Sequence, residues 1–330
     1  MTLPPSMAAI EMREPGGPDV LQSATRPLPV LHDHEILVKV AAAGVNGPDL
    51  VQRRGLYPPP KGASDLLGLE VSGEVVAVGA KQTLWSVGDK LCGLTNGGGY
   101  AEYVAIDATH CLPIPAGISL TDAAGLPETY FTVWSNVFFN HKLPENGNFL
   151  VHGGAGGIGS TAIQLGAALG LSVYTTAADA DACTYCESLG AHHAINFNTD
   201  DFVSILREAG GADIILDIIG GDYIARTIKA ARHDARIVQL AFNAGSRVEI
   251  DLMPVMLKRL SFTGSTLRSR PDRFKTDVAA DLKSRVWPLF AAQNSSLRAT
   301  TFTSFALADA GQAHALMESA SQRGKILLTI

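Results

Sequence analysis

Three glycines at fixed spacing are the first residues in the sequence whose type points to a chemical task. Gly154, Gly156 and Gly159 fit the pattern G-x-G-x-x-G within the stretch NFLVHGGAGGIGSTAIQLG. In a strand–loop–helix unit, the first glycine permits a tight turn, the second lets the backbone approach a diphosphate, and the third lets helix and strand pack closely. The helix N-terminus then offers N–H groups to the phosphates. We therefore expect a dinucleotide to be bound by Gly154, Ala155, Gly156, Gly157, Ile158 and Gly159.

The elements around this loop alternate between short apolar strands and helices. From residue 124 onwards, runs such as FLVH, SVYTTA, HAINF and ADIILDIIG are separated by helical patterns. This alternation indicates βαβ units and a parallel, doubly wound sheet of six strands. Ligands of such sheets bind at the carboxyl ends of the strands. The further cofactor-binding residues predicted from these positions are Thr176, Ile218, Gly220, Ala241, Phe242, Thr266 and Leu267.

The rest of the chain has a different character. The first third contains many short strands joined by glycine and proline turns, which is typical of a compact, barrel-like domain. The C-terminal stretch contains short strand-like segments of the same kind as the first third, TTFTSFAL and KILLTI. We therefore predict a catalytic domain formed by residues 1–123 and 268–330, with a dinucleotide-binding Rossmann domain of residues 124–267 inserted in it and a cleft between them.

Composition excludes several classes of function. The formal net charge is -6 and the basic residues are scattered, whereas nucleic-acid binding needs a concentrated basic surface. No run of 18 apolar residues indicates a membrane span, and the N-terminus lacks the pattern of a secretory signal. We expect a cytoplasmic protein that binds neither nucleic acid nor membranes.

Taken together, several segments resemble the medium-chain dehydrogenase/reductase superfamily, and within it the zinc-free, zeta-crystallin-like quinone oxidoreductases. The resemblance covers nearly the whole chain. It implies an α/β Rossmann domain inserted in a GroES-like catalytic domain, and usually a homodimer. The segments that carry it are AGVNGPDLVQRRGLYPPP, GLEVSGEVVAVG, VGDKLCGLTNGGGYAEY, GLPETYFTVW, VHGGAGGIGSTAIQLG and GKILLTI.

The resemblance also predicts that no zinc is bound. Zinc-dependent members of the superfamily have a cysteine where this chain has Asn46, and often a histidine where it has Gly47. Their G-H-E motif is Gly68-Leu69-Glu70 here, so the histidine ligand is replaced by Leu69. A catalytic zinc site needs three protein ligands and one open position.

In the absence of zinc, other groups must stabilise the acceptor oxygen as negative charge develops on it. Positions that match the family nominate Asn46, Asp49 and Tyr57 as catalytic residues. Asn46 would donate its amide to the substrate carbonyl or the nicotinamide ribose, Tyr57 would hydrogen-bond to or stack on the acceptor, and Asp49 would orient them. By the same resemblance, Thr132 approaches the nicotinamide. Lys325, in the segment GKILLTI, is expected to face the cleft and to contact the cofactor. Turn formation by Asn46 and Asp49 remains the structural alternative.

One departure from the family pattern concerns the choice of cofactor. NADPH-using relatives read G-S-x-x-K after the second cofactor strand, followed later by a tyrosine, and these groups hold the 2′-phosphate. The corresponding residues here are Ala178, Asp179 and Ala182, with Phe197 at the tyrosine position. A carboxylate repels a phosphate but can accept hydrogen bonds from a 2′-hydroxyl. We therefore predict that NAD(P)H is the cofactor and that NADH is favoured, unless Arg268 or Arg270 compensates.

The predicted function is zinc-independent reduction of a quinone by hydride transfer from NAD(P)H. A related alternative is an enone or enoyl-thioester reductase, which also needs a proton donor. An alternative of another class is a non-catalytic NAD(P)H-binding protein with a structural or regulatory role. Dimer formation is expected from the family, with the edge strand near residues 261–266 as the candidate surface.

Overall fold

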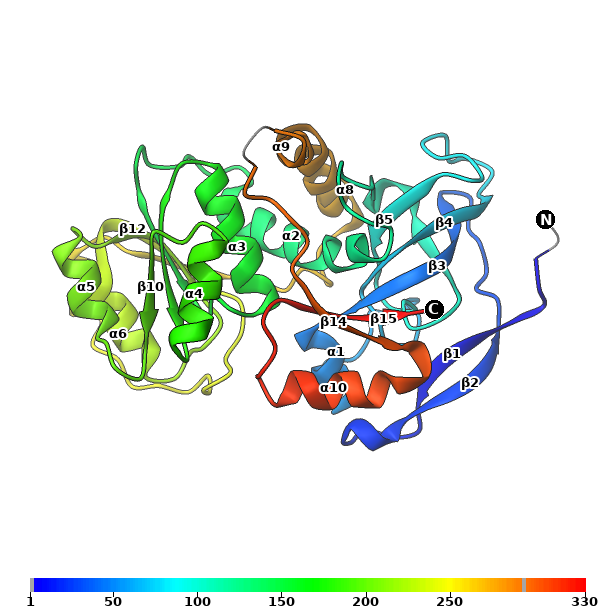
Figure 1. Ribbon diagram of the computed structural model, residues 1–330, viewed down its shortest axis with the longest axis horizontal. Coiled ribbons are helices and arrows are strands. Elements are labelled where there is room, and N and C mark those ends of the chain that lie inside the picture. Colours follow the sequence, from blue (N-terminus) through cyan, green and yellow to red (C-terminus); the bar gives the residue numbers. More distant parts are fainter. Residues whose placement is uncertain (1–2, 293–294) are drawn as a thin grey trace. The chain divides into compact units, whose positions relative to one another are not determined.

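The computed structural model describes residues 3–292 and 295–330 and divides into two compact units (Figure 1). Unit 1 contains the chain up to Phe131 together with Arg268–Ala292 and Arg298–Ile330, and unit 2 is built from Thr132–Leu267 with a short segment ending at Leu297. The first junction between these units lies after residue 131, whereas the boundary expected from the sequence lies after residue 123. Ala124 is fully buried against residues of unit 1, which explains why the segment after it counts with that unit.

Unit 2 is built on a sheet of six strands in the order β10-β9-β8-β11-β12-β13, and every neighbouring pair is parallel. In chain order this is 3-2-1-4-5-6, the arrangement of dinucleotide-binding sheets. Its central strands are buried on both faces, as their continuous apolar runs predict. The strands are β8 (Asn148–His152), β9 (Ser172–Ala177), β10 (His193–Asn196), β11 (Ala212–Asp217), β12 (Ala231–Gln239) and β13 (Ser261–Gly264).

Helices cover both faces of this sheet, α3 and α4 on one side and α5 and α6 on the other (Figure 1). The second pair packs on the strands through a core that includes Phe202, Leu206, Ile224 and Ile228. The helices of unit 2 are α3 (Gly157–Ala168), α4 (Ala180–Ser188), α5 (Phe202–Glu208), α6 (Tyr223–Ala230) and α7 (Met253–Leu257). The π-helix η4 (Trp134–Phe138) continues α2 (Pro127–Val133), which begins in unit 1.

Unit 1 is β-rich. A hairpin of β1 (Ser6–Met12) and β2 (Leu21–Pro27) accompanies a sheet of seven strands. Its path is β14-β15-β3-β4-β5-β7, with β6 paired to β3. The C-terminal strand β15 thus lies between β14 and β3, so the C-terminal stretch is part of this sheet. The strands are β3 (Glu35–Val45), β4 (Glu70–Val78), β5 (Lys90–Leu94), β6 (Tyr103–Asp107), β7 (Cys111–Pro113), β14 (Thr301–Ala306) and β15 (Lys325–Thr329).

Short helices connect the strands of unit 1. Two of them supply residues to the site below: α1 (Gly47–Arg53), which directly follows β3, and α10 (Ala310–Glu318), which precedes β15. The others are η1 (Pro18–Val20), η2 (Ala108–His110), η3 (Asp122–Gly125), α8 (Asp272–Asp281), η5 (Leu282–Val286), α9 (Trp287–Phe290) and η6 (Leu307–Asp309).

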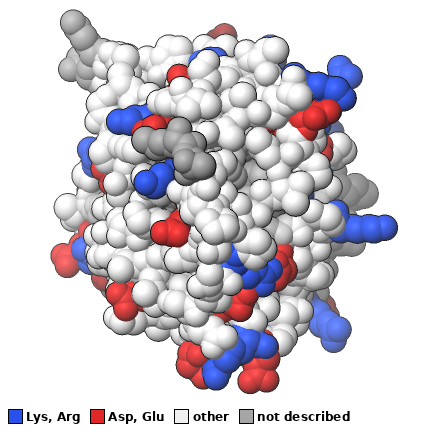
Figure 2. Space-filling view, turned by 90° about the vertical axis from the view of Figure 1, so that its right-hand side faces the viewer, with Lys and Arg blue, Asp and Glu red and all other residues white. Residues whose placement is uncertain are grey.

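Charged side chains of both signs are interspersed over the face shown in Figure 2, without a large area of one sign. Within the described ranges, no helix is long and apolar enough to cross a membrane.

Candidate active site

The glycine loop lies between β8 and α3, and two of its three motif glycines are required by close packing. A Cβ atom on Gly154 would lie 2.0 Å from Oγ1 of Thr175, and one on Gly159 would lie 2.2 Å from the carbonyl oxygen of Gly153. Gly153 itself has φ +75°, a conformation that favours glycine. These contacts explain why the turn from strand to helix is built from glycine.

Gly156 differs from the other two because the space beside it is open. The nearest atom to a Cβ built there, the carbonyl oxygen of Gly153, is 3.8 Å away. Gly156 is also the N-cap of α3, so the helix begins with Gly157, Ile158 and Gly159 and without a capping side chain. An open cradle at a helix N-terminus fits a diphosphate, because the backbone N–H groups can reach it. The residues present therefore suit the dinucleotide that the motif predicts.

Buried hydroxyl groups support this loop from below. Oγ1 of Thr176 accepts a hydrogen bond from the Gly153 N–H at 3.2 Å and contacts Nδ1 of His152 at 3.3 Å. The other ring nitrogen of His152 contacts Oγ1 of Thr227 at 3.0 Å. Burial lowers the pKa of His152 to about 4, so the ring is neutral at pH 7. Thr176 is 1% exposed, which makes it a support of the loop, and its predicted contact with the cofactor stays a prediction.

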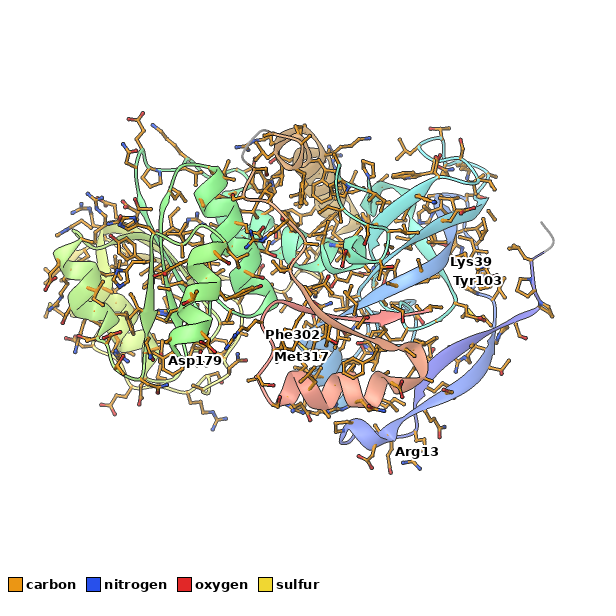
Figure 3. All side chains as sticks on the ribbon, viewed as in Figure 1. Arg13, Lys39, Tyr103, Asp179, Phe302 and Met317 are labelled. Carbon is orange, nitrogen blue, oxygen red and sulfur yellow. The ribbon has the colours of Figure 1, made fainter. Side chains whose placement is uncertain are left out.

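Asp179 lies at the N-terminus of α4 (Figure 3). Its Oδ1 accepts a hydrogen bond from the Ala182 N–H at 2.7 Å, as an N-cap does. Phe197 directly follows β10 and is 39% exposed. The two segments are joined by Nδ2 of Asn198, which donates to the Ala178 carbonyl at 2.7 Å. The residues compared with the 2′-phosphate site of relatives therefore come from adjoining segments.

The predicted strand-end residues also lie in unit 2. Ile218 borders the glycine loop, because a Cβ on Gly153 would lie 3.0 Å from its Cδ1 atom. Gly220 has φ +68° and donates its N–H to Oδ1 of Asp217 at 3.0 Å. Ala241 accepts from Nε2 of Gln239 at 2.6 Å. The remaining ones are Phe242, which is 46% exposed, Thr266 and Leu267, which follow β13, and Thr132, whose carbonyl accepts from Nδ2 of Asn136 at 2.9 Å.

In unit 1, Asp49 is fully buried and joins the start of α1 to the segment that precedes β4. Its Oδ2 accepts from the Asn46 N–H at 2.9 Å, and its Oδ1 accepts from the Gly68 N–H at 3.0 Å. Asp49 is the third residue of α1 and Asn46 is its N-cap, so this is the acidic half of a capping box. Burial raises the pKa of Asp49 to about 6, although the two N–H groups oppose the shift. Asp49 thus fixes the backbone at the start of α1, as the turn-forming alternative expects, and its predicted orienting role in catalysis stays a prediction.

The side chain of Asn46 is clamped between two buried opposite charges. Its Nδ2 donates to Oε1 of Glu70 at 2.8 Å, while its Oδ1 accepts from Nζ of Lys325 at 2.5 Å. Lys325 and Glu70 form an ion pair of 2.6 Å, and their side chains are 5% and 0% exposed. The other oxygen of Glu70 accepts from the Glu128 N–H at 2.8 Å. The ammonium group of Lys325 therefore has both of its partners, Asn46 and Glu70, within unit 1, and its predicted contact with the cofactor stays a prediction. Glu70 was not nominated at all.

A chain of buried groups leads from Asp49 to α10. The Tyr100 hydroxyl lies 3.4 Å from Oδ2 of Asp49 and 3.0 Å from Nε2 of His314, and Nδ1 of His314 lies 3.2 Å from Arg53. Arginine only donates, so Nδ1 must accept and the neutral ring carries its proton on Nε2. Burial lowers the pKa of His314 to about 3, and the charge of Arg53 adds to this shift. The chain is therefore directional: Arg53 donates to His314, His314 to Tyr100, and Tyr100 to Asp49.

Tyr57, the third predicted catalytic residue, stands apart from this network. It is half-buried in the loop after α1, and the guanidinium carbon of Arg268 lies 5.6 Å from the centroid of its ring. Burial raises the pKa of Tyr57 and the charge of Arg268 opposes that shift. Arg268 itself donates to the Asn96 carbonyl and to Gln52, and Arg270 lies over the Phe274 ring.

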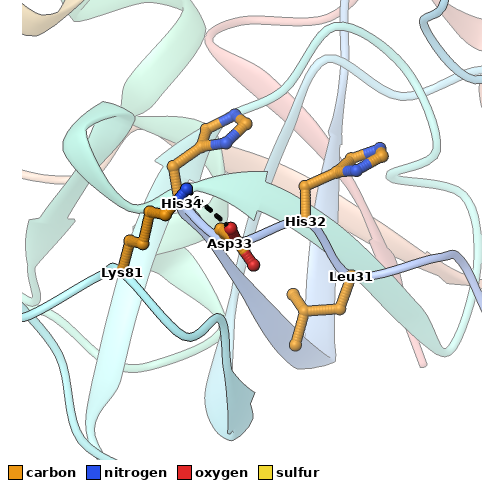
Figure 4. Close-up of a pocket in the computed structure, with 5 residues that line it drawn as sticks. All are labelled: Leu31, His32, Asp33, His34 and Lys81. Carbon is orange, nitrogen blue, oxygen red and sulfur yellow. Dashed lines mark ion pairs between the residues drawn. The ribbon is translucent and has the colours of Figure 1, made fainter.

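Metal-binding groups are absent from the described part of the chain, which contains no cluster of three or more His, Cys, Asp or Glu side chains that could hold an ion. A surface hollow on unit 1 does bring His32 and His34 together with Asp33 and Lys81 (Figure 4). The two imidazole rings are stacked at 6.2 Å, and Asp33 pairs with Lys81 at 3.0 Å. None of the predicted site residues lines this hollow.

Comparisons with known proteins identify similar families and structures over most of the chain. Residues 32–116 match the family described as alcohol dehydrogenase GroES-like domain, and residues 157–284 match the family described as zinc-binding dehydrogenase. The chain is 27% identical to quinone oxidoreductase of Mus musculus over 98% of each sequence. Its fold is similar to that of Escherichia coli quinone oxidoreductase complexed with NADPH, with a TM-score of 0.82, 27% identity and coverage of 98% and 100%. A structure of an NAD-dependent alcohol dehydrogenase is similar too, with a TM-score of 0.84, 27% identity and coverage of 98% and 99%.

Proposed function

The chain belongs to the zinc-free quinone oxidoreductases of the medium-chain dehydrogenase/reductase superfamily, and on this basis we propose that it reduces a quinone with a hydride from NAD(P)H. The observation that carries the proposal within this chain is the open cradle at Gly156, in front of the uncapped helix α3. The bound dihydronicotinamide supplies a hydride, which brings two electrons and one proton to the acceptor. A second proton from water completes the hydroquinone.

In unit 1, the amide of Asn46 can stabilise the acceptor oxygen, the task that a metal ion performs in zinc-dependent relatives. Asn46 has a second amide N–H whose nearest partner is the Gly44 carbonyl at 3.4 Å, a long contact that a substrate oxygen can replace. The clamp by Glu70 and Lys325 fixes which end of the amide donates. Such a preorganised donor stabilises charge that develops on the acceptor oxygen. Tyr57 offers an aromatic face for a planar acceptor, and Asp49 holds the backbone of Asn46.

Cofactor absorbance at 340 nm, followed with a chelator and a simple quinone present, tests this function. Quinone-dependent oxidation of the cofactor that is insensitive to the chelator is expected. Cofactor binding without turnover of any quinone would contradict it. An enone would then be the next acceptor, since the related reductases deliver the same hydride to a carbon–carbon double bond. Failure of the enone as well would favour a non-catalytic role.

We further propose that NADH is preferred to NADPH. Asp179 occupies the position of the phosphate-binding serine, and Arg268 and Arg270, the arginines that could compensate, are engaged with partners in unit 1. The double variant Asp179→Ser, Ala182→Lys should raise the ratio of kcat/KM for NADPH to that for NADH by about tenfold, since a favourable charge replaces a repulsive one. Serine also caps helices, so α4 should persist. Each single variant serves as a control. A ratio of kcat/KM values that does not change in the double variant would contradict the assignment of NADH preference to Asp179.

A second copy of the chain is the proposed protein partner, and β13 is the proposed surface. This strand lies at the end of the six-stranded sheet, and all four of its residues are exposed. Phe262 on β13 is 49% exposed, and the nearby segment of α7 exposes Leu252, Met253, Met256 and Leu257 by 56–66%. An exposed apolar surface beside a strand edge is typical of an interface. The predicted cytoplasmic location stays a prediction.

A further inference from the structure

Two cationic side chains, Arg268 and Lys275, are buried close to each other, and Arg268 lies over the ring of Tyr57. Arg268 is 7% exposed and Lys275 is 1% exposed. Nε and Nη2 of Arg268 donate to the Asn96 carbonyl, and Nη1 donates to Oε1 of Gln52 at 2.7 Å. Nζ of Lys275 donates to Oδ1 of Asn96 at 2.9 Å and to the Arg268 carbonyl at 3.2 Å. Asn96 therefore joins the two cations through its main chain and its side chain.

These hydrogen bonds satisfy the donors but do not neutralise the charges. The acceptors named above are all amide or carbonyl oxygens. The nearest carboxylate to Lys275, Asp272, is 3.7 Å away and 69% exposed, so solvent screens it. Burial is the main cause that lowers the pKa of both cations. Asp272 opposes this shift at Lys275 and the charge of Arg268 adds to it, while Tyr57 and Asp49 oppose the shift at Arg268. Asp49 also acts on Arg268, but its own oxygens are engaged with Asn46, Gly68 and Tyr100.

A buried pair of like charges is costly to maintain, because each ion loses its hydration and repels the other. It also creates a positive potential at the groups in front of it, and the low dielectric of the interior extends that potential. The group in front of Arg268 is the ring of Tyr57, where a planar acceptor is expected to lie. This position would favour an acceptor that is negatively charged before the hydride arrives.

We propose that the Arg268–Lys275 pair selects a quinone that carries a negative charge, such as a sulfonate, a carboxylate or an ionised hydroxyl group. The inference rests on the proposed quinone reductase function and specifies its substrate class. Arg268 contributes by its charge and by holding the Tyr57 ring, whereas Lys275 contributes by its charge and by holding Asn96. The selection acts through the electrostatic field and requires no direct contact between Lys275 and the substrate.

The test compares 1,4-naphthoquinone with 1,4-naphthoquinone-2-sulfonate in the full-length enzyme. The measured quantity is kcat/KM for the sulfonate divided by kcat/KM for the neutral quinone, so that the different reactivities of the two acceptors cancel between variants. Lys275→Met should lower this ratio by about tenfold, the order of magnitude expected when one charge is removed from a partly screened interior. Lys275→Arg should keep the ratio within about twofold. Lys81→Met removes a charge that is 79% exposed on the same unit and should leave the ratio unchanged.

Equal losses of activity with both quinones in Lys275→Met would show a structural role only and would overturn the inference. If the unmodified enzyme reduces neither quinone, the proposed function fails and this inference fails with it. A second measurement needs no variant. Naphthalene-2-sulfonate should compete with 1,4-naphthoquinone at an inhibition constant at least about fivefold below that of 2-naphthalenemethanol. Equal inhibition constants would likewise overturn the charge selection.

Discussion

The amide of Asn46 has only one orientation that its neighbours allow. Its oxygen faces the ammonium group of Lys325 and its nitrogen faces the carboxylate of Glu70. A flipped amide would place its NH2 against the ammonium group and its oxygen against the carboxylate, and both contacts would be repulsive. The ion pair therefore serves a directional purpose, because it determines which amide atom can meet the substrate. This role of positioning is independent of any net gain in stability, which buried ion pairs often do not provide.

The activity is expected to depend on pH through Asp49. Its pKa of about 6 lies above the ordinary value of 3.8, so the folded chain holds the proton more tightly than the unfolded chain. This group therefore contributes most to folding stability below about pH 4, and that contribution is lost as the pH rises through about 6. The activity should depend on pH in the opposite direction to this stability contribution. The protonated carboxyl group is a poorer acceptor for the Asn46 and Gly68 N–H groups, so kcat/KM should fall as the pH drops below about 6.

A pH–rate profile with saturating cofactor checks this, with Asp49→Asn as the comparison. The variant cannot titrate and should lack the acidic limb at a lower overall rate. An acidic limb of the same pKa in Asp49→Asn would assign it to another group.

Some residues of the site could be predicted from the sequence, whereas their interaction partners could not. Asn46 and Asp49 could be nominated because they match a family motif, but their partners could not. Glu70 and Lys325 are 255 positions apart, and their meeting depends on β15 being inserted beside β3. A signal was nevertheless present, since each is a charged residue within an apolar strand, GLEVSG and GKILLTI. Tyr100 and His314 likewise acquire their roles only through tertiary contact.

Among the elements, the loop from β8 to α3 contains one glycine that is expected to serve cofactor binding and another that is required for folding. Gly156→Ala should leave the melting temperature within about 2 °C, because the space for a Cβ is open and the φ of -78° suits alanine. It should weaken NADH binding by about tenfold or more, since the methyl group fills the diphosphate cradle. Gly159→Ala should instead destabilise the fold, because its Cβ meets the Gly153 carbonyl at 2.2 Å.

Thermal unfolding and a titration of intrinsic fluorescence with NADH distinguish the two variants. Unimpaired NADH binding by Gly156→Ala would place the diphosphate elsewhere.

The strands and helices of unit 2 could be predicted because each has a local pattern, either a continuous apolar run or a helical period. The six-stranded parallel sheet is confirmed in this way. The helical pattern of residues 120–139 predicts one helix, whereas the structure divides the stretch into η3, α2 and the π-helix η4. The reason lies in tertiary packing, as Ala124 and Trp134 are both fully buried. Such breaks depend on neighbours that a local pattern does not contain.

At the scale of the whole molecule, the exposed edge of unit 2 should determine the oligomeric state. The double variant Phe262→Lys, Met256→Lys places two like charges on the proposed interface of each copy and should convert a dimer to a monomer in sedimentation experiments. Val30→Lys, at a residue of unit 1 that is 77% exposed, is the matched control. A double variant that remains dimeric would exclude this surface.

The insertion of β15 between β14 and β3 also has a consequence for biosynthesis. Unit 2 is formed almost entirely by one continuous segment, so it can fold on the ribosome as soon as that segment has emerged. Unit 1 cannot close until β15 has been synthesised, and until then the carboxylate of Glu70 has no ammonium partner. The nascent chain therefore passes through a stage in which a finished nucleotide-binding unit is joined to an open sheet. That open sheet edge is where chaperones would be expected to engage the newly made protein.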